Sequence, residues 1–251
     1  MHPLTSNLPL DDPQTTELRR TIIRDKFFLR RIYNQWYCFV ASVVPSGDGA
    51  VLEVGSGAGF IKDIIPEAIT SEAFPCTGVD MVLHAEALQF ANSSLRTIIM
   101  IDVLHHVSRP CEFFSEAVRC LRPGGIIAMV EPWITPWSSF VYQKLHHEPF
   151  KPDATEWEFS SDGPLTGANI ALPWIIFERD RMKFESEYPQ LRIRSVQPIM
   201  PFLYLMSGGI SFRSLMPEWS YGMWFNIERL LSSLMPKIAM FAYIIIDRLD
   251  T

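Results

Sequence analysis

The apolar residues of this chain follow two spacings that alternate along much of its length. Nearly continuous apolar runs occur at about 50–54, 97–101 and 126–130. Segments with apolar residues three and four positions apart lie beside them, at about 111–121 and 173–187. Continuous runs predict strands buried on both faces, and the wider spacing predicts helices that cover them. The alternation therefore indicates an α/β fold with a mostly parallel sheet.

The first part of the chain, residues 1–49, predicts a flexible lead followed by one long helix. Thr15 or Thr16 would cap this helix, and apolar residues at helical spacing continue it to about Val44. A Pro-Ser-Gly-Asp-Gly turn then separates it from the first strand. We expect residues 50–251 to form the main domain.

Two acids compete for the end of the second strand. If this strand ended at Asp80, residues 81–96 would have to hold a helix, a third strand and their loops. That is too little chain for the usual α/β connections. We therefore place the second strand at 68–72, ending at Glu72, and the third strand at 80–85.

The alternation stops after the fifth strand. Residues 133–172 are rich in Trp, His, Pro and Gly and have weak periodicity, so we expect an inserted substrate cap over the carboxyl ends of the strands. A sixth strand is predicted at 191–198 and a seventh at 238–246. An aromatic helical segment at 203–236 would lie between them.

Composition narrows the classes of protein that fit. The chain has 251 residues, 48% of them hydrophobic, which is enough for a large core. A net charge of −6 argues against a nucleic-acid partner. The four cysteines form no C-x-x-C pair, and residues 1–12 lack the basic and apolar regions of a signal peptide. No uncharged apolar run is long and regular enough to span a bilayer. We expect a cytoplasmic protein with reduced thiols.

The most informative segment is the turn after the first strand, Val-Leu-Glu-Val-Gly-Ser-Gly-Ala-Gly-Phe. Glu53 is followed by Gly55, Gly57 and Gly59, and glycines let a backbone turn tightly and approach a ligand closely. The dinucleotide fingerprint is G-x-G-x-x-G, but Phe60 stands where its third glycine would be. This departure argues against a nicotinamide oxidoreductase, which we keep as the least favoured alternative.

Three motifs in order carry a family resemblance: VLEVGSGAG at 51–59, IIMIDVLHHV at 98–107 and FFSEAVRCLRPGGIIAMVEP at 113–132. Together they resemble the class I S-adenosylmethionine-dependent methyltransferases, in particular the methyltransferase type 11 family. The resemblance implies a Rossmann-like, seven-stranded, mostly parallel sheet whose last strand is antiparallel. It also implies S-adenosylmethionine as the cofactor and in-line methyl transfer to a small-molecule, glycan or lipid-linked acceptor. A catalytically silent binding protein with the same fold is the alternative.

By this resemblance the cofactor lies at the carboxyl ends of the strands. The three glycines would pass under its methionine and ribose part, and Glu53 would act near the methionine amino group. A carboxylate can accept hydrogen bonds from both ribose hydroxyls, a role we assign to Glu72. The residues expected to bind the cofactor are Glu53, Gly55, Ser56, Gly57, Gly59, Glu72, His84, Ala85, Asp102 and Val103.

The far side of this expected site is less regular. The family often has an acid that contacts the adenine amino group, but here that position falls on His84. The contact would then come from Ala85 or Glu86. Asp102 and Val103, at the end of the fourth strand, would line the other side of the cofactor.

Two histidine pairs are candidates for chemistry. His105 and His106 follow the fourth strand, where a histidine could act as a general base or simply pack and hydrogen-bond. His146, His147 and Glu148 lie in the insertion and suggest a metal site, but adjacent histidines in a strand or helix point apart. We expect no metal, and a pocket role for one of the second pair.

Basic and aromatic residues suggest where the acceptor comes from. Arginines and a lysine crowd the N-terminal helix, either as a solvated face or as a surface attracted to anionic lipid. Aromatic residues of the insertion and of 219–225 would form core, a subunit interface, or a site for a bulky, partly apolar acceptor. We expect a monomer or homodimer, peripheral contact with a membrane at most, and no nucleic acid.

Overall fold

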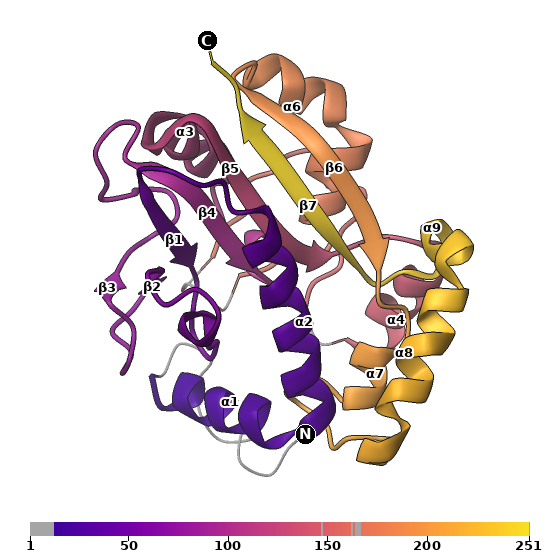
Figure 1. Ribbon diagram of the computed structural model, residues 1–251. Helices are drawn as coiled ribbons and strands as arrows, with labels where there is room; N and C mark the ends of the chain where they lie inside the picture. The colour runs from indigo at the N-terminus through magenta and orange to yellow at the C-terminus, as the bar shows by residue number, and fades with distance from the viewer. Residues whose placement is uncertain (1–12, 147, 162, 164–166, 251) are drawn as a thin grey trace.

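The computed structural model describes residues 13–146, 148–161, 163 and 167–250. It contains a seven-stranded sheet in the order β3-β2-β1-β4-β5-β7-β6 (Figure 1). Strands β1 to β5 are parallel, and β7 runs antiparallel to both of its neighbours. The predicted class I fold, with its antiparallel last strand, is confirmed. The strands are β1 Ala50–Val54, β2 Ile69–Glu72, β3 Met81–Val82, β4 Leu95–Ile101, β5 Leu121–Pro132, β6 Leu191–Ile199 and β7 Phe241–Arg248.

Helices cover both faces of this sheet. Alternate residues of each strand point to opposite faces, and the buried apolar residues on each face pack into a separate core. Leu52 and Ile98 face one core, which includes side chains of α3, α5 and α6. Val51 and Ile99 face the other, which includes side chains of α1, α2, α4 and α7. The helices are α1 Pro13–Asp25, α2 Phe27–Val43, α3 Pro110–Cys120, α4 Pro136–Leu145, α5 Leu172–Trp174, α6 Arg181–Glu187, α7 Leu203–Ser207, α8 Tyr221–Leu230 and α9 Met235–Ile238.

The expectation of one long N-terminal helix is wrong. The helix breaks at Lys26, whose backbone is extended between α1 and α2. The Lys26 ammonium donates hydrogen bonds to the carbonyl oxygens of Gly209 and Phe212. Ile22 and Ile23 of α1 are buried, so the break lets α1 turn and bury its apolar face. In Figure 1, α1 lies below the arrowheads of β1, β4 and β5. The expected lead at 1–12 lies outside the described residues.

The register chosen for the second strand is confirmed. Glu72 is the last residue of β2, and Asp80 lies in the connection to β3. The Asp80 carboxylate accepts hydrogen bonds from the Thr70 amide and hydroxyl at 2.8 and 2.9 Å. After the glycine loop the chain forms only a 3₁₀ turn, Ile61–Asp63. The connections between the first three strands, 55–68 and 73–80, contain no α-helix.

The chain after β5 is more helical than its periodicity predicted. Within the expected cap at 133–172, α4 begins at a capping box made by Thr135 and Ser138. The helix expected at 173–187 is divided, because the π-helical turn Ile175–Arg179 separates α5 from α6. The aromatic segment at 203–236 contains α7, α8, the start of α9 and two 3₁₀ turns, Glu218–Ser220 and Ser232–Leu234.

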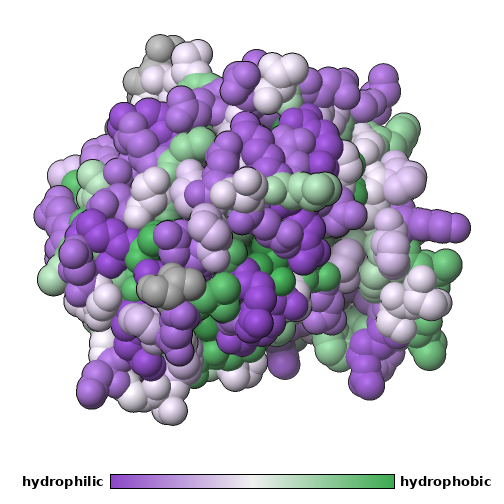
Figure 2. All heavy atoms as spheres, turned by 90° about the horizontal axis from the view of Figure 1, so that it is seen from above, coloured by the Kyte–Doolittle hydropathy of each residue, from purple (hydrophilic) through white to green (hydrophobic). Residues whose placement is uncertain are grey.

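Figure 2 looks down on the end of the molecule where β7 finishes. Hydrophilic side chains cover most of this face, and hydrophobic residues gather in smaller patches between them. The end of the sheet that carries the candidate site faces the other way. Among the described residues, no helix is both long and apolar enough to cross a membrane.

Candidate functional site

The loop after β1 has room for backbone only. Gly55 and Gly57 have φ angles of +69° and +39°, values that favour glycine. A Cβ atom on Gly55 would lie 2.7 Å from a methyl of Val103, and one on Gly59 would lie 1.9 Å from the Tyr37 hydroxyl. Side chains at these positions would therefore displace the walls of the loop.

Glu53 lies beneath this loop and is only 1% exposed. Burial raises the pKa of its carboxyl group to about 7, although hydrogen bonds with Ser56 and Tyr37 act in the opposite direction. Its Oε2 atom has no hydrogen-bond partner among the described residues. A buried, unpartnered carboxylate oxygen is suited to an ammonium group, such as that of the methionine part of the expected cofactor.

Glu72 reaches the same loop from the end of β2. Its carboxylate accepts hydrogen bonds from the Ala73 amide at 2.9 Å and from the Gly57 amide. Burial raises the pKa of this carboxyl group. From α1, Arg20 donates a hydrogen bond of 2.8 Å to the Gly57 carbonyl oxygen. The loop is thus enclosed by β2 on one side and α1 on the other. Asp80 instead pairs with Lys62 at 2.6 Å and is largely exposed.

The remaining residues that were expected to bind the cofactor differ in position and in exposure. Asp102 has a φ angle of +63° at the end of β4, and the Val103 side chain contacts the glycine loop. His84 is exposed, whereas Ala85 is buried in the hydrophobic core. Glu86 pairs with the Ser108 hydroxyl at 3.4 Å. The adenine contact expected from 84–86 stays a prediction.

Beside Asp102, a short turn, Leu104–His106, brings two histidines together with two carboxylates. His105 Nδ1 lies 3.0 Å from Glu131 Oε2, and His105 Nε2 lies 3.6 Å from Glu148 Oε2. His106 Nε2 lies 3.7 Å from Glu148 Oε1. We call these four side chains, His105, His106, Glu131 and Glu148, the histidine–carboxylate cluster. Glu131 was not among the site residues predicted from sequence, although its place at the end of a strand could have indicated it. No sequence pattern linked Glu148 to His105. His147 lies outside the described residues.

Charge and burial act in opposite directions within this cluster. Burial favours a neutral imidazole, but the interactions with the carboxylates of Glu131 and Glu148 outweigh it and raise the pKa of His105 well above its ordinary value. Burial lowers the pKa of His106 to about 4. Burial by itself would raise the pKa of Glu148, but the histidines beside this carboxylate keep its pKa far below the ordinary value.

Three tyrosines from three helices lie around Asp102. Tyr33 comes from α2, Tyr142 from α4 and Tyr204 from α7. Burial raises the pKa of each hydroxyl, and the negative charge of Asp102 raises it further. Burial also raises the pKa of Asp102 itself to about 7. The three hydroxyl groups therefore lie within electrostatic range of the end of β4.

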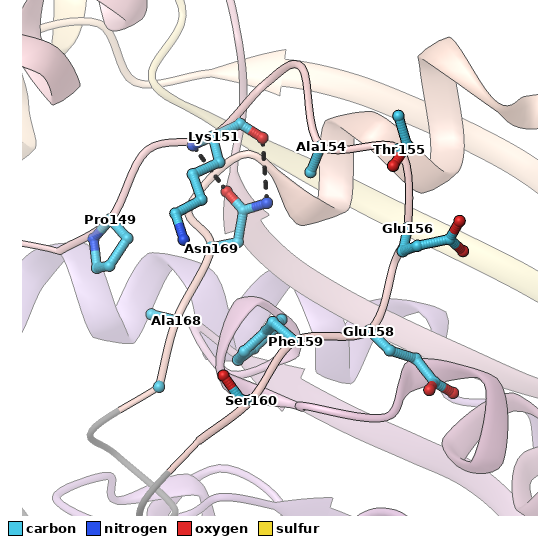
Figure 3. Close-up of a pocket in the computed structure, with 11 residues that line it drawn as sticks. Pro149, Lys151, Ala154, Thr155, Glu156, Glu158, Phe159, Ser160, Ala168 and Asn169 are labelled. Carbon is cyan, nitrogen blue, oxygen red and sulfur yellow. Dashed lines mark hydrogen bonds between the residues drawn. The ribbon is translucent and has the colours of Figure 1, made fainter.

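A hollow of about 360 Å³ lies beside the cluster, between the segments 149–160 and 167–169 (Figure 3). Two hydrogen bonds join these segments, from the Lys151 amide to Asn169 Oδ1 at 3.0 Å and from Asn169 Nδ2 to the Lys151 carbonyl at 3.2 Å. The backbone amide of Asn169 also donates a hydrogen bond of 2.9 Å to the carbonyl oxygen of His105. The insertion is thus fixed to the turn that carries the two histidines.

Comparison with known proteins gives a family match. Residues 60–129 match the family model described as "Methyltransferase domain", less than a third of the chain. No curated protein matches the chain in sequence.

Solved structures give a fold match over nearly the whole chain. One belongs to the complex of the Haloferax volcanii Trm112 methyltransferase activator with a putative methyltransferase (13% identity, TM-score 0.55, covering 96% of this chain and 97% of that one). Another is geranyl diphosphate C-methyltransferase from Streptomyces coelicolor (13%, 0.50, 98% and 90%). A third is phosphoethanolamine N-methyltransferase 2 from Haemonchus contortus, with S-adenosylmethionine (12%, 0.51, 95% and 58%). The chain contains a methyltransferase domain with the class I fold, and S-adenosylmethionine is the cofactor that is consistent with this domain.

Proposed function

We propose that this methyltransferase-domain protein transfers a methyl group from S-adenosylmethionine to a bulky, partly apolar acceptor. The observation that supports it best is the convergence of Glu53 and Glu72 on the glycine loop, where Val103 packs against Gly55 and one buried oxygen of Glu53 is left unpartnered. The geometry suits a ligand with an ammonium at one end and hydroxyl donors further along.

The residues of this chain would hold the cofactor and align the acceptor. Glu53 would bind the ammonium, Glu72 the ribose hydroxyls, and Asp102 and Val103 would close the other side. The bound sulfonium supplies an electrophilic methyl group, so the protein has mainly to hold the acceptor in line with it. Such positioning can contribute about 7–11 kcal/mol to catalysis. The base role expected of His105 and His106 stays a prediction, and the proposed transfer does not depend on it.

The acceptor is proposed from the surroundings of Asp102 and from one exposed surface. The tyrosines around Asp102 combine apolar rings with hydroxyl groups, which suits an acceptor of mixed character. Geranyl diphosphate, bound in the Streptomyces coelicolor structure, is an example of such a compound. The tryptophans Trp133 and Trp157 of the insertion add no support, because both are buried in the core.

Large exposed apolar side chains are concentrated in one stretch of the chain, 212–234. Trp219 is 80% exposed and Leu230 83% exposed. We call the following set the apolar surface: Phe212, Leu215, Trp219, Met223, Leu230 and Leu234. On the N-terminal helices, Arg24, Arg30 and Arg31 are exposed. We propose that the apolar surface and these arginines rest on an anionic membrane that supplies the acceptor.

Two measurements test the proposal. Calorimetry with S-adenosylhomocysteine should show binding, and NAD binding in its place would reject a methyltransferase. Release of S-adenosylhomocysteine should then follow addition of a lipid-linked acceptor but not of small hydrophilic compounds.

Flotation with anionic liposomes tests the membrane contact. The double variant Trp219→Ser/Leu230→Ser should lose flotation, whereas Met182→Ser, at an exposed methionine of α6, should keep it. Turnover on a hydrophilic acceptor alone, with no flotation, would contradict the acceptor class and leave the methyl transfer intact.

A further inference from the structure

The two adjacent histidines of the histidine–carboxylate cluster point the same way. Neighbouring residues in a strand point apart, but the Leu104–His106 turn places the rings of His105 and His106 with their centroids 4.2 Å apart. Glu148 arrives from the chain after α4 and places one carboxylate oxygen near each Nε2 atom, at 3.6 and 3.7 Å. Three potential ligand atoms, one from each residue, lie within 4.8 Å of one another.

The opposite ring nitrogens of both histidines are already held. His106 Nδ1 lies 3.0 Å from the Gly167 carbonyl oxygen, which can only accept, so Nδ1 carries a proton. His105 Nδ1 lies 3.0 Å from Glu131 Oε2, and the other oxygen of Glu131 accepts from the amides of Val103 and Leu104. Histidines that bind metals usually donate their second N–H to a carboxylate or a backbone carbonyl in this way. This arrangement orients both Nε2 atoms toward Glu148.

The spacing also fits a metal better than a pair of hydrogen bonds. Distances of 3.6 and 3.7 Å exceed the usual limit of about 3.2 Å for a hydrogen bond to nitrogen. Two ligands at about 2.0–2.1 Å from a tetrahedral zinc ion are separated by roughly 3.4 Å. The two distances belong to different oxygens of Glu148, and the three candidate ligand atoms lie within 4.8 Å of one another. A movement of Glu148 toward both histidines would therefore complete the site.

We propose that His105, His106 and Glu148 bind a divalent transition-metal ion, with zinc as the ion that fits this donor set. Two imidazoles and one carboxylate form a set found in catalytic zinc sites, and a fourth position stays open to water or to an oxygen of another molecule. Glu131 and the Gly167 carbonyl act as positioning groups. The metal site itself does not depend on the proposed function. Only the further statement, that an oxygen atom of the acceptor occupies the open position, rests on the proposed function.

The test uses untagged, full-length protein that has been stripped with a chelator and then titrated with Zn²⁺ and, separately, with Co²⁺. We expect one ion per chain and the visible spectrum of cobalt bound by nitrogen and oxygen. Mg²⁺, which prefers oxygen ligands, should not compete. Absorption bands of thiolate-bound cobalt would assign the ion to the cysteines and overturn the proposal without any variant.

Variants separate the ligands from their surroundings. His106→Ala and Glu148→Gln should each weaken zinc binding by at least 100-fold, and Glu131→Gln by about 10–100-fold. Glu112→Gln, at an exposed acid of α3, is the control and should bind as the wild type does. Circular dichroism checks that each variant is folded. Unchanged zinc affinity in folded His106→Ala and Glu148→Gln, or no binding by the wild type, would overturn the site. Binding of S-adenosylhomocysteine is measured on the same samples, so failure of the methyltransferase proposal is recorded separately.

Discussion

Replacement of Glu72 by alanine should weaken cofactor binding more than any change at Asp80. Glu72 is buried at the end of β2, and its carboxylate already orders the glycine loop through the amides of Gly57 and Ala73. If it also accepts the ribose hydroxyls, the variant loses hydrogen bonds to a charged group worth about 1.5–3 kcal/mol. That free energy corresponds to roughly a 10- to 150-fold rise in the dissociation constant of S-adenosylhomocysteine, since about 1.4 kcal/mol is one factor of ten.

Asp80→Ala is the matched control, because Asp80 is an acid in the connection that begins directly after Glu72. Asp80 holds Thr70 and Lys62 rather than the glycine loop, so its loss should lower the unfolding temperature without changing cofactor affinity. Calorimetry with S-adenosylhomocysteine, accompanied by thermal unfolding of each variant, gives both numbers. Weaker binding in Asp80→Ala but not in Glu72→Ala would show that the assignment of the ribose acid is wrong.

Further predictions concern the loop, the core and pH. Gly57→Val should abolish binding of S-adenosylhomocysteine in calorimetry, since φ is +39° and a Cβ would lie 3.0 Å from Glu72 Oε2, whereas Gly222→Ala, in α8 and in open space, should keep it. Phe177→Ala removes a fully buried ring packed on Phe114 and Phe184 and should cost about 3–5 kcal/mol in urea unfolding. The exposed control Met182→Ala should change stability by less than about 0.5 kcal/mol, and equal losses would contradict the packing described. Burial raises the pKa of Glu228 to about 7 from an ordinary 4.5. The folded state therefore binds this proton more tightly than the unfolded state does, and the stability of the protein falls as pH rises from about 4.5 to about 7. Glu228→Gln keeps an oxygen for the amides of Phe202 and Leu203, so between pH 5 and pH 8 it should lose less stability than the wild type, and parallel profiles would refute this.

Local sequence was sufficient to predict those elements whose position depends on their own residues. The apolar runs at β1 and β4 placed both strands, and chain length alone decided that β2 ends at Glu72. The glycine spacing located the loop, and both positive φ angles at Gly55 and Gly57 agree with it. Such features follow from sequence because burial on both faces and left-handed backbone each restrict the residue type at a single position.

Contacts between distant segments could not be predicted in this way. The helix pattern runs through Lys26 without interruption, whereas in the structure the chain breaks there and the Lys26 ammonium bonds to the carbonyl groups of Gly209 and Phe212. His105 meets Glu131 and Glu148 only because a turn, the end of β5 and the chain after α4 converge. Apolar periodicity records which face of an element is buried, whereas the partner of a polar side chain depends on the path of the whole chain. For this protein the sequence therefore determined the sheet and the glycine loop, and the tertiary structure decided how α1 covers that loop and which charged groups meet beside it.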